Sequence, residues 1–216
     1  LRVLDSDGRG NDFILAEAIQ FAVQNGADVI NLSLGTPTES ALLQDVVGMA
    51  TANGVVVVAA AGNLDSDLQQ YPAAVASVLA VTAVDPTSSK ASFANYGAWV
   101  DIAAPGQSIT STFPIDGYAQ WSGASMATAF ISGQAALIRR QNPAMPAPVV
   151  ATLIQSTAQP LDGLNPNYQN QLGAGLADIS RSLSEAPPIA LTTVSCGQVV
   201  LINVVLSHDL ADCPGD

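Results

Sequence analysis

Apolar residues recur along this chain with two different spacings. Between residues 13 and 25 they return every three or four positions, the spacing of one face of a helix, and Gly26 follows where such a helix would end. Residues 27–35 and 55–61 are short, largely apolar runs, which are typical of strands buried on both faces of a sheet. Amphipathic helices that alternate with buried strands predict a mainly parallel sheet covered by helices on both sides.

The full set of predicted elements follows this alternation. Helices are expected at residues 13–25, 38–53, 125–138 and 147–157, and strands at 27–35, 55–61, 78–84 and 99–103. A hairpin of residues 109–112 and 118–121 is expected before the third helix, and the glycine-rich residues 172–176 are expected to open a short helical turn. The predicted fold class is α/β, with three αβα layers around the sheet.

A proline pair at Pro187-Pro188 predicts a boundary near the carboxyl end. We expect one domain over residues 1–183, and a linker with the start of a β-rich segment over residues 184–216. Cys196 and Cys213, the only two cysteines, lie in this second part. In an oxidising compartment a disulfide between them would contribute about 3 kcal/mol, whereas in the cytosol two free thiols are the alternative.

The composition narrows the classes of function. The chain of 216 residues is 49% hydrophobic and 11% charged, with a net charge of −12, a pattern that indicates a secreted or otherwise extracytoplasmic protein. Six Lys and Arg residues and no basic stripe exclude a nucleic-acid partner. No apolar run reaches the roughly 20 residues of a membrane span. The chain begins at Leu1 without a signal peptide, so we interpret it as a piece of a longer protein.

Acidic residues and glycines alternate from Asp5 to Asp12 and suggest a calcium loop at first sight. Arg9 stands where a ligand is needed, and Ala16 stands where an EF-hand loop closes on glutamate. A glycine-rich turn, with Asn11 or Asp12 capping the next helix, is therefore the favoured interpretation.

Ser125 is the candidate for chemistry, because small residues surround it and a run of good helix formers follows. A serine at the start of a helix lies beside free backbone N–H groups and the positive end of the helix dipole, which stabilise an oxyanion. The alternative is that Ser125 only caps a buried, alanine-rich helix. Asn63, at the end of a predicted strand, could likewise be an oxyanion donor or an ordinary turn residue.

The segment from Gly123 to Ala129 is similar to the serine motif of the subtilisin-like serine proteases (subtilases), usually Gly-Thr-Ser-Met-Ala-x-Pro. Here Ala124 replaces the usual Thr and Ala129 the usual Pro, and both changes keep the residue small. The resemblance extends from about residue 2 to residue 182. Its further motifs, in the family's order, are Ala60-Ala61-Gly62-Asn63, Tyr71-Pro72-Ala73, Phe93-Ala94-Asn95-Tyr96-Gly97 and Ala104-Pro105-Gly106.

The resemblance implies a subtilisin-like fold, incomplete at the N-terminus, and a role for each matching segment. It makes Ser125 the nucleophile and Asn63 the oxyanion donor. An extended polypeptide substrate would bind between Gly8-Arg9-Gly10 and Ser33-Leu34-Gly35, by strand addition. Ala60, Ala61 and Gly62 would form the wall of the pocket for the side chain before the scissile bond, and such small residues suggest a roomy pocket for large apolar side chains.

No cofactor is required by this chemistry, although calcium is possible as a structural ion. In many family members backbone carbonyls after the Tyr-Pro segment hold a cation, which makes Ala73, Val75 and Val78 the candidate positions.

A serine nucleophile needs a histidine base and a carboxylate that orients the base. In subtilases both precede the segment that corresponds to this chain. The one histidine, His208, lies in the predicted tail and matches no family motif. We therefore expect the triad Asp and His on an upstream part of the same catalytic domain, and little proteolysis by this chain alone.

The leading hypothesis is accordingly a serine-type endopeptidase. An inactive relative that binds extended peptides is the alternative. An unrelated hydrolase or a dinucleotide-binding domain is disfavoured, because the chain contains neither a Gly-x-Ser-x-Gly elbow nor a Gly-x-Gly-x-x-Gly motif after a strand.

Overall fold

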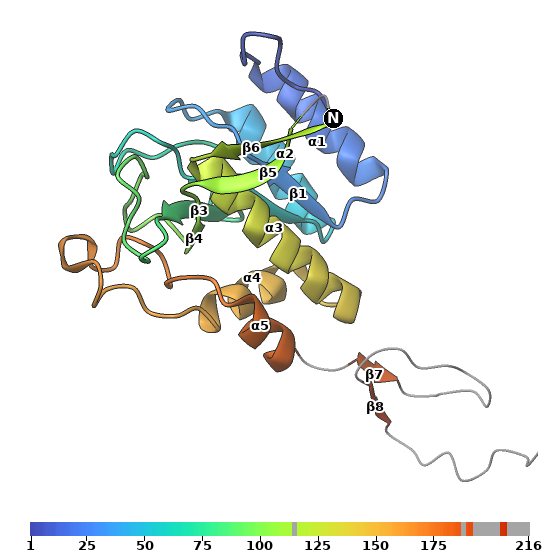
Figure 1. Ribbon diagram of the computed structural model, residues 1–216. Coiled ribbons are helices and arrows are strands. Elements are labelled where there is room, and N and C mark those ends of the chain that lie inside the picture. The colour runs from blue at the N-terminus through green and yellow to red at the C-terminus, as the bar shows by residue number, and fades with distance from the viewer. Residues whose placement is uncertain (114–115, 187–188, 192–203, 207–216) are drawn as a thin grey trace, which may run out of the picture.

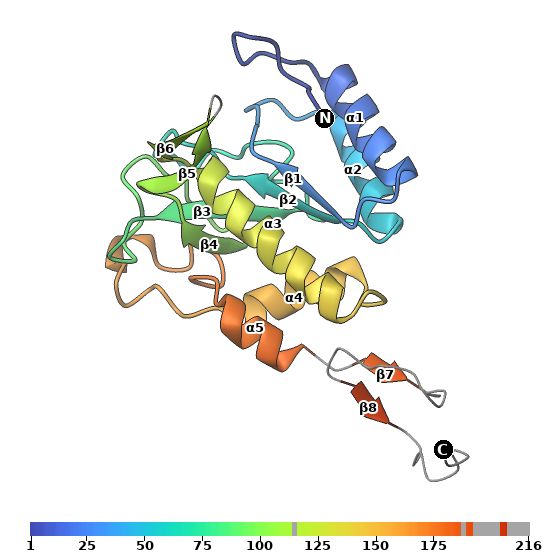
Figure 2. The ribbon, with the colours of Figure 1, turned by 45° about the vertical axis from the view of Figure 1, so that its right-hand side comes forward.

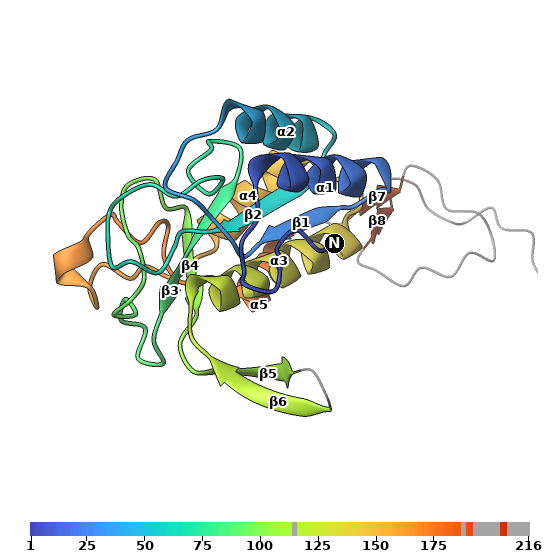
Figure 3. The ribbon, with the colours of Figure 1, turned by 90° about the horizontal axis from the view of Figure 1, so that it is seen from above.

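The computed structural model describes residues 1–113, 116–186, 189–191 and 204–206. Four parallel strands form the central sheet in the order β1 (Val29–Leu32), β2 (Val56–Ala60), β3 (Leu79–Val84) and β4 (Ile102–Pro105). Helices α1 (Asp12–Gln24) and α2 (Ala41–Ala52) pack on one face, and α3 (Ala124–Gln141) and α4 (Ala147–Ser156) on the other. Figure 3 shows α1 and α2 on one side of the sheet and α3 on the other. The predicted α/β class is confirmed.

Strand β2 explains why the sequence contains a continuous apolar run. Its side chains alternate between the two faces: Val56 and Val58 belong to the cluster under α3 and α4, whereas Val57 and Ala59 belong to the cluster under α1 and α2. All five residues of the strand are buried. Burying a valine fully stabilises a fold by roughly 1.5–3 kcal/mol, so a strand with two buried faces requires apolar residues at every position.

Side-chain caps set the starts of the first two helices. The side-chain oxygen of Asn11 accepts a hydrogen bond from Ile14 N at 3.0 Å, which confirms the glycine-rich turn with a capping asparagine. In α2 the cap is Ser40, whose hydroxyl accepts from Leu43 N at 3.4 Å. This helix therefore begins at Ala41, three positions later than expected.

Two other predictions were wrong: one strand is shifted, and one helical turn is missing. The fourth strand was expected at residues 99–103 but is β4, Ile102–Pro105, because Val100 N donates to Gly97 O and closes a turn before it. The helical turn expected at residues 172–176 is absent: Gly173 (φ +70°) and Gly175 (φ +129°) have backbones that a helix does not allow. Helix α5 follows instead at Ile179–Glu185, after the short 3₁₀ helix η1 (Pro166–Tyr168).

The predicted hairpin is present as strands β5 (Ile109–Phe113) and β6 (Gly117–Trp121), which pair antiparallel. It forms a separate sheet and stands away from the body of the molecule (Figure 3). The chain leaves β6 directly into Gly123 and α3. Figures 1 and 2 both show the first turn of α3 beside the hairpin.

The carboxyl-terminal part is described only in pieces. Helix α5 extends two residues past position 183, and the expected domain boundary there stays a prediction. Beyond it, β7 (Ile189–Leu191) and β8 (Val204–Leu206) pair in parallel. Cys196, Cys213 and His208 lie outside the described residues. In the part of the chain that the structure describes, no helix has the length and apolar character needed to cross a membrane.

Candidate active site

Ser125 is the second residue of α3, and the helix start is held close to the sheet. Gly123 precedes the helix, and its N–H donates to Gly106 O at 2.7 Å. A Cβ on Gly106 would lie 2.8 Å from Gly123 O and 2.5 Å from the Cβ of Ala83, so only glycine allows this approach. The N-cap residue Gly123 has no side chain to cap α3. Ala124 N is bonded to Asn63 Oδ1 and Met126 N to Gly123 O, so among the described residues Ser125 N is the first-turn donor that stays available.

Two reciprocal hydrogen bonds join Ser125 to the segment after β1. The Ser125 hydroxyl donates to Ser33 O at 3.3 Å, and the Ser33 hydroxyl donates to Ser125 O at 2.9 Å. Asn31 donates in turn to the Ser33 hydroxyl at 2.9 Å. Ser125 thus lies at the carboxyl end of the parallel sheet, the edge at which open α/β folds bind ligands.

Asn63, which follows β2, meets the same helix start. Ala124 N donates to Asn63 Oδ1 at 2.7 Å. Because this bond occupies the amide oxygen, the nitrogen Nδ2 is the group that Asn63 can offer to a substrate. A Cβ on Gly123 would lie 3.4 Å from Nδ2, so the amide of Asn63 packs against Gly123, the N-cap residue of α3. The structure therefore brings the two predicted catalytic residues close together, because Asn63 bonds to the backbone N–H of Ala124, the residue before Ser125.

A buried asparagine, Asn95, shapes the loop that carries Asn63. It is 0% exposed, donates to Ala61 O at 2.9 Å and accepts from Leu64 N at 2.8 Å. Gly62, between these contacts, has a φ of +109°, and a Cβ there would lie 2.6 Å from Asn95 Nδ2. The sequence presented Asn95 only as part of a family motif, since a side chain that bonds to a distant backbone leaves no periodic signal.

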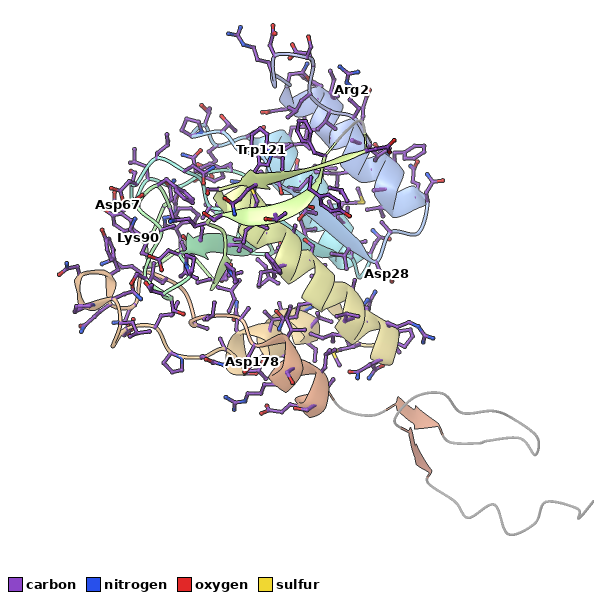
Figure 4. The ribbon with its side chains drawn as sticks, viewed as in Figure 1. Arg2, Asp28, Asp67, Lys90, Trp121 and Asp178 are labelled. Atoms are coloured by element: carbon purple, nitrogen blue, oxygen red, sulfur yellow. The ribbon has the colours of Figure 1, made fainter. Side chains whose placement is uncertain are left out.

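An ion pair fixes the far side of the same loop. Lys90 Nζ contacts Asp65 Oδ1 at 2.6 Å, and the side chain of Lys90 is only 3% exposed. The ammonium also donates to Ala91 O and Ala94 O, at 3.1 and 2.9 Å. It lies 5.2 and 4.9 Å from the ring centroids of Tyr96 and Tyr168, within the range of cation–π attraction. Figure 4 shows Lys90 among the loops at the end of the sheet near Asp67.

The buried ammonium of Lys90 therefore has an acceptor for each of its three N–H groups. Asp65 follows Asn63 by two residues, so the pair anchors the loop of the candidate oxyanion donor. Sequence reasoning missed it, because Lys90 and Asp65 are 25 positions apart.

The two predicted substrate-binding segments face each other. Gly8 and Gly10 line one side, and Ser33, Leu34 and Gly35 the other side, of a groove of about 320 Å³. Arg9 lines a neighbouring hollow instead, and its N–H donates to Asp5 Oδ1 at 2.9 Å. Ala60 and Ala61 are buried at the end of β2, next to Gly62. The groove is the right kind of site for an extended chain, because its walls expose glycine backbone.

The predicted cation positions lie in the loop before β3. Ala73 and Val78 are buried, and the carbonyl of Val75 already accepts a hydrogen bond from Val78 N at 2.9 Å. The three residues offer only neutral carbonyl oxygens. Calcium sites usually include carboxylates, so this donor set fits a weakly held ion better than a tightly bound calcium. Among the described residues no cluster of three His, Cys, Asp or Glu side chains could hold a metal.

At the opposite end of the sheet, Asp101 is a half-buried carboxylate. Burial raises the pKa of Asp101 above the ordinary carboxyl value, and hydrogen bonds from Ala80 N and from Gln155 partly oppose this. Asp101 lines an apolar cavity of about 530 Å³ between α2 and α4, away from Ser125.

Comparison with known proteins identifies the family. The sequence model of the Subtilase family, Peptidase S8, matches residues 1–175, and the chain belongs to that family. It is 42% identical over 165 residues to Subtilisin BL of Lederbergia lenta, covering 76% of this chain and 61% of that protein. It is 44% identical over 162 residues to Subtilisin DY of Bacillus licheniformis, covering 73% and 59%. The chain therefore spans about three-fifths of these relatives.

Solved structures agree on the fold. The prenylagaramide maturation protease PagA superposes with a TM-score of 0.77 at 29% identity, covering 85% of this chain and 70% of that one. The self-cleaved protease domain of PatA gives 0.74 at 32% identity, covering 83% and 69%. The resemblance inferred from the serine motif is confirmed at the level of family and fold.

Proposed function

We propose that this chain is the carboxyl-terminal part of the catalytic domain of a serine-type endopeptidase, with Ser125 as nucleophile and Asn63 as oxyanion donor. The hydrogen bond from Ala124 N to Asn63 Oδ1 carries the proposal. This bond joins the loop after β2, which carries the amide of Asn63, to the first turn of α3, which carries the hydroxyl of Ser125. A bond that fixes a donor before substrate binds is the kind of preorganisation on which acyl-transfer catalysis depends.

In the proposed reaction the Ser125 oxygen bonds to the carbonyl carbon of the peptide, and its proton passes to a histidine. The carbonyl oxygen becomes an oxyanion that accepts from Asn63 Nδ2 and from an N–H of the first turn of α3. The C–N bond then breaks, and the leaving amine takes the proton from the histidine. Water hydrolyses the resulting ester by the same steps and restores the serine.

The histidine and the aspartate that orients it would come from a segment that precedes Leu1 in the parent protein. In the described residues the Ser125 hydroxyl bonds to Ser33 O and to no base. We therefore expect this chain alone to be nearly inactive, with at most the residual rate that an oxyanion hole and substrate binding provide.

An uncovered face of α3 supports a missing partner of this kind. An apolar groove of about 720 Å³ runs along the helix beside Ser125, lined among others by Ala129, Phe130 and Leu137. Phe130 is 39% and Leu137 48% exposed. Strand β1, which α3 also contacts, is the edge of the described sheet and has a neighbour there on one side only. An upstream part of the same domain would cover both features.

The substrate would be a polypeptide bound in extended form between residues 8–10 and 33–35. The groove between these segments does not depend on the nucleophile, so a relative that binds peptides without cleaving them is the alternative. We also propose a secreted or extracytoplasmic location, from the low charge content and the acidic balance, and an optional structural cation near Ala73, Val75 and Val78 with no catalytic cofactor.

The test is covalent labelling of the parent protein with a fluorophosphonate probe, followed by peptide mapping. The Ser125 oxygen should displace fluoride from phosphorus in the parent and react far more slowly in residues 1–216 alone. Ser125→Ala should abolish labelling. Ser156→Ala, which changes a serine on α4, is the matched control and should label normally. A folded parent that binds peptides but does not label would favour the non-catalytic alternative.

A further inference from the structure

The cavity at the amino end of the sheet has no part in the proposed reaction. Its volume is about 530 Å³, within the range of roughly 300–1,000 Å³ that is typical of sites for small molecules. It lies across the starts of β2 and β3, whereas Ser125 lies at the carboxyl end of the same sheet. A ligand in this cavity would therefore bind apart from the substrate groove.

Small residues on two helices leave this space open. Gly48 and Ala52 lie one turn apart on α2, Ala147 and Ala151 lie one turn apart on α4, and all four line the cavity. Side chains this short do not reach across the gap between the helices. The residues that line it at the starts of β2 and β3 are mostly valines and leucine. The cavity therefore suits a ligand with an apolar body.

The carboxylate of Asp101 interrupts this apolar lining. Asp101 precedes β4, and its oxygens accept from Ala80 N at 2.8 Å and from Gln155 Nε2 at 3.2 Å. Both donors are neutral. Among the described residues no Lys, Arg or His lines the cavity, and none forms an ion pair with Asp101. Burial raises the pKa of Asp101, since a half-buried carboxylate without a counter-charge is costly, and a bound cation would offset this cost.

We propose that this cavity binds a small aliphatic amine, whose ammonium group pairs with Asp101 and whose carbon chain lies between α2 and α4. Gln155 extends the polar end of the site. Because its Nε2 is bonded to Asp101, its Oε1 is left as a second acceptor for the ammonium N–H groups. The site goes beyond the proposed peptidase function and does not depend on it.

The lining favours an amine over the other classes of ligand. A bare calcium ion takes about six to eight oxygen ligands, whereas this cavity offers one carboxylate among mostly apolar residues. An acid would bring a second negative charge next to Asp101. An alcohol fits the apolar part of the cavity but lacks the charge that strengthens a hydrogen bond to a carboxylate.

Isothermal titration calorimetry of the parent protein with n-hexylamine and n-hexanol is the experiment. The two ligands have the same carbon chain, and only the amine is positively charged at neutral pH. We expect hexylamine to bind roughly tenfold more tightly than hexanol, the effect of one hydrogen bond between charged groups. Each CH₂ added from butylamine to octylamine should tighten binding roughly two- to fourfold, because it buries more apolar surface.

The variant Asp101→Asn tests the polar end of the site. It keeps the shape of the side chain and removes its charge, so hexylamine should lose its advantage while hexanol binds as before. Asp45→Asn, which changes an exposed carboxylate on α2, is the matched control and should leave the ratio of the two affinities unchanged. If Asp101→Asn does not fold, the ratio of the two ligands in the unaltered parent still decides.

The variant Gly48→Leu tests the apolar end. A Cβ on Gly48 would meet no atom within 4 Å, so a side chain can enter the cavity without displacing a neighbour. We expect it to weaken the binding of both ligands roughly fivefold or more, because it occupies their space. Gly48→Ala is the matched control, and its single methyl group should change both affinities by less than about twofold.

Four results would overturn the amine site. They are an amine that binds no more tightly than the alcohol, an advantage that persists in Asp101→Asn, binding that Gly48→Leu leaves intact, and calcium that hexylamine cannot displace from Asp101. Saturating hexylamine should also leave fluorophosphonate labelling of Ser125 unchanged, and slower labelling would place the amine in the substrate groove instead. A parent that binds hexylamine as expected but does not label at all contradicts only the proposed peptidase function.

Discussion

Two segments meet the start of α3, and they differ in how many contacts fix them to the rest of the protein. The loop of residues 61–66 is fixed by the buried Asn95 and by the ion pair between Asp65 and Lys90. In the part of the chain that the structure describes, β5 and β6 pair with no other strand, and their stacked rings of Phe113 and Trp121 are 48% and 54% exposed. Figure 4 shows Trp121 on this hairpin.

The contrast agrees with the role proposed for Asn63. An oxyanion donor contributes only if it is in place when charge develops, so the loop of Asn63 needs rigid support. The hairpin has no part in the proposed reaction and needs no such support. Four expected outcomes test this division.

The largest effect should come from removing the donor. We expect Asn63→Ala to lower kcat of the parent roughly 100- to 1,000-fold with little change in KM, because Nδ2 acts on the transition state. Steady-state kinetics on one peptide measures both constants. Asn53→Ala is the control. Asn53 is also an asparagine next to β2, but it precedes the strand at the end of α2, whereas Asn63 follows the strand. Equal losses in the two variants would contradict a special role for Asn63.

A smaller loss should follow when the anchor of the loop is cut. Asp65→Ala removes the carboxylate that meets Lys90 Nζ at 2.6 Å and leaves a buried ammonium with one partner fewer. Because displacement of a catalytic group by a fraction of an ångström lowers the rate, we expect kcat to fall roughly tenfold. Glu185→Ala, which breaks the exposed ion pair with Arg181 on α5, should change nothing.

A double-mutant cycle shows whether Asp65 acts through Asn63. In an Asn63→Ala background the donor is already gone, so Asp65→Ala should cost almost nothing further in kcat. An undiminished tenfold loss in that background would mean that the ion pair supports catalysis by another route.

The hairpin should be more tolerant than the loop. We expect Trp121→Ala to lower the free energy of unfolding by less than about 1.5 kcal/mol, because the ring is half exposed and stacks on the similarly exposed Phe113. Its kcat for peptide cleavage should change little, whereas Asp65→Ala lowers kcat. Denaturant unfolding and kinetics on the same protein give both numbers. A kcat loss as large as that of Asp65→Ala would remove the distinction between the segments.

The smallest effect concerns the far end of the sheet. Burial raises the pKa of Asp101, so the folded protein holds this proton more tightly than the unfolded chain. The free energy of unfolding therefore falls as pH rises from the ordinary carboxyl pKa through the raised value. Asp101→Asn should remove this slope and be the more stable protein above that range. Unfolding curves at a series of pH values test the sign, and a variant less stable at neutral pH would contradict it.

Much of the fold was predictable because it depends on local periodicity. The runs at residues 55–61 and 78–84 are apolar at nearly every position, and a strand with two buried faces is the structure that requires this. Boundaries were less predictable. The start of α2 depends on the side chain of Ser40, and the start of β4 on a turn closed by Gly97.

The candidate site divides in the same way. Ser125, Asn63 and the glycine segments could be named from motifs, because each lies in a short stretch of characteristic residues. Asn95 and Lys90 could not be given roles, because each acts on a distant segment: Asn95 on Ala61, 34 positions before it, and Lys90 on Asp65, 25 positions before it.

The sequence by itself thus determined the alternation of helices and strands, the family, and the residues that would carry the chemistry. These depend on spacing along the chain, which is visible without a fold. Only the tertiary structure decided which side chains hold Asn63 in place. Those contacts join loops that are distant in sequence, and their energies depend on burial, which exists only once the chain has packed.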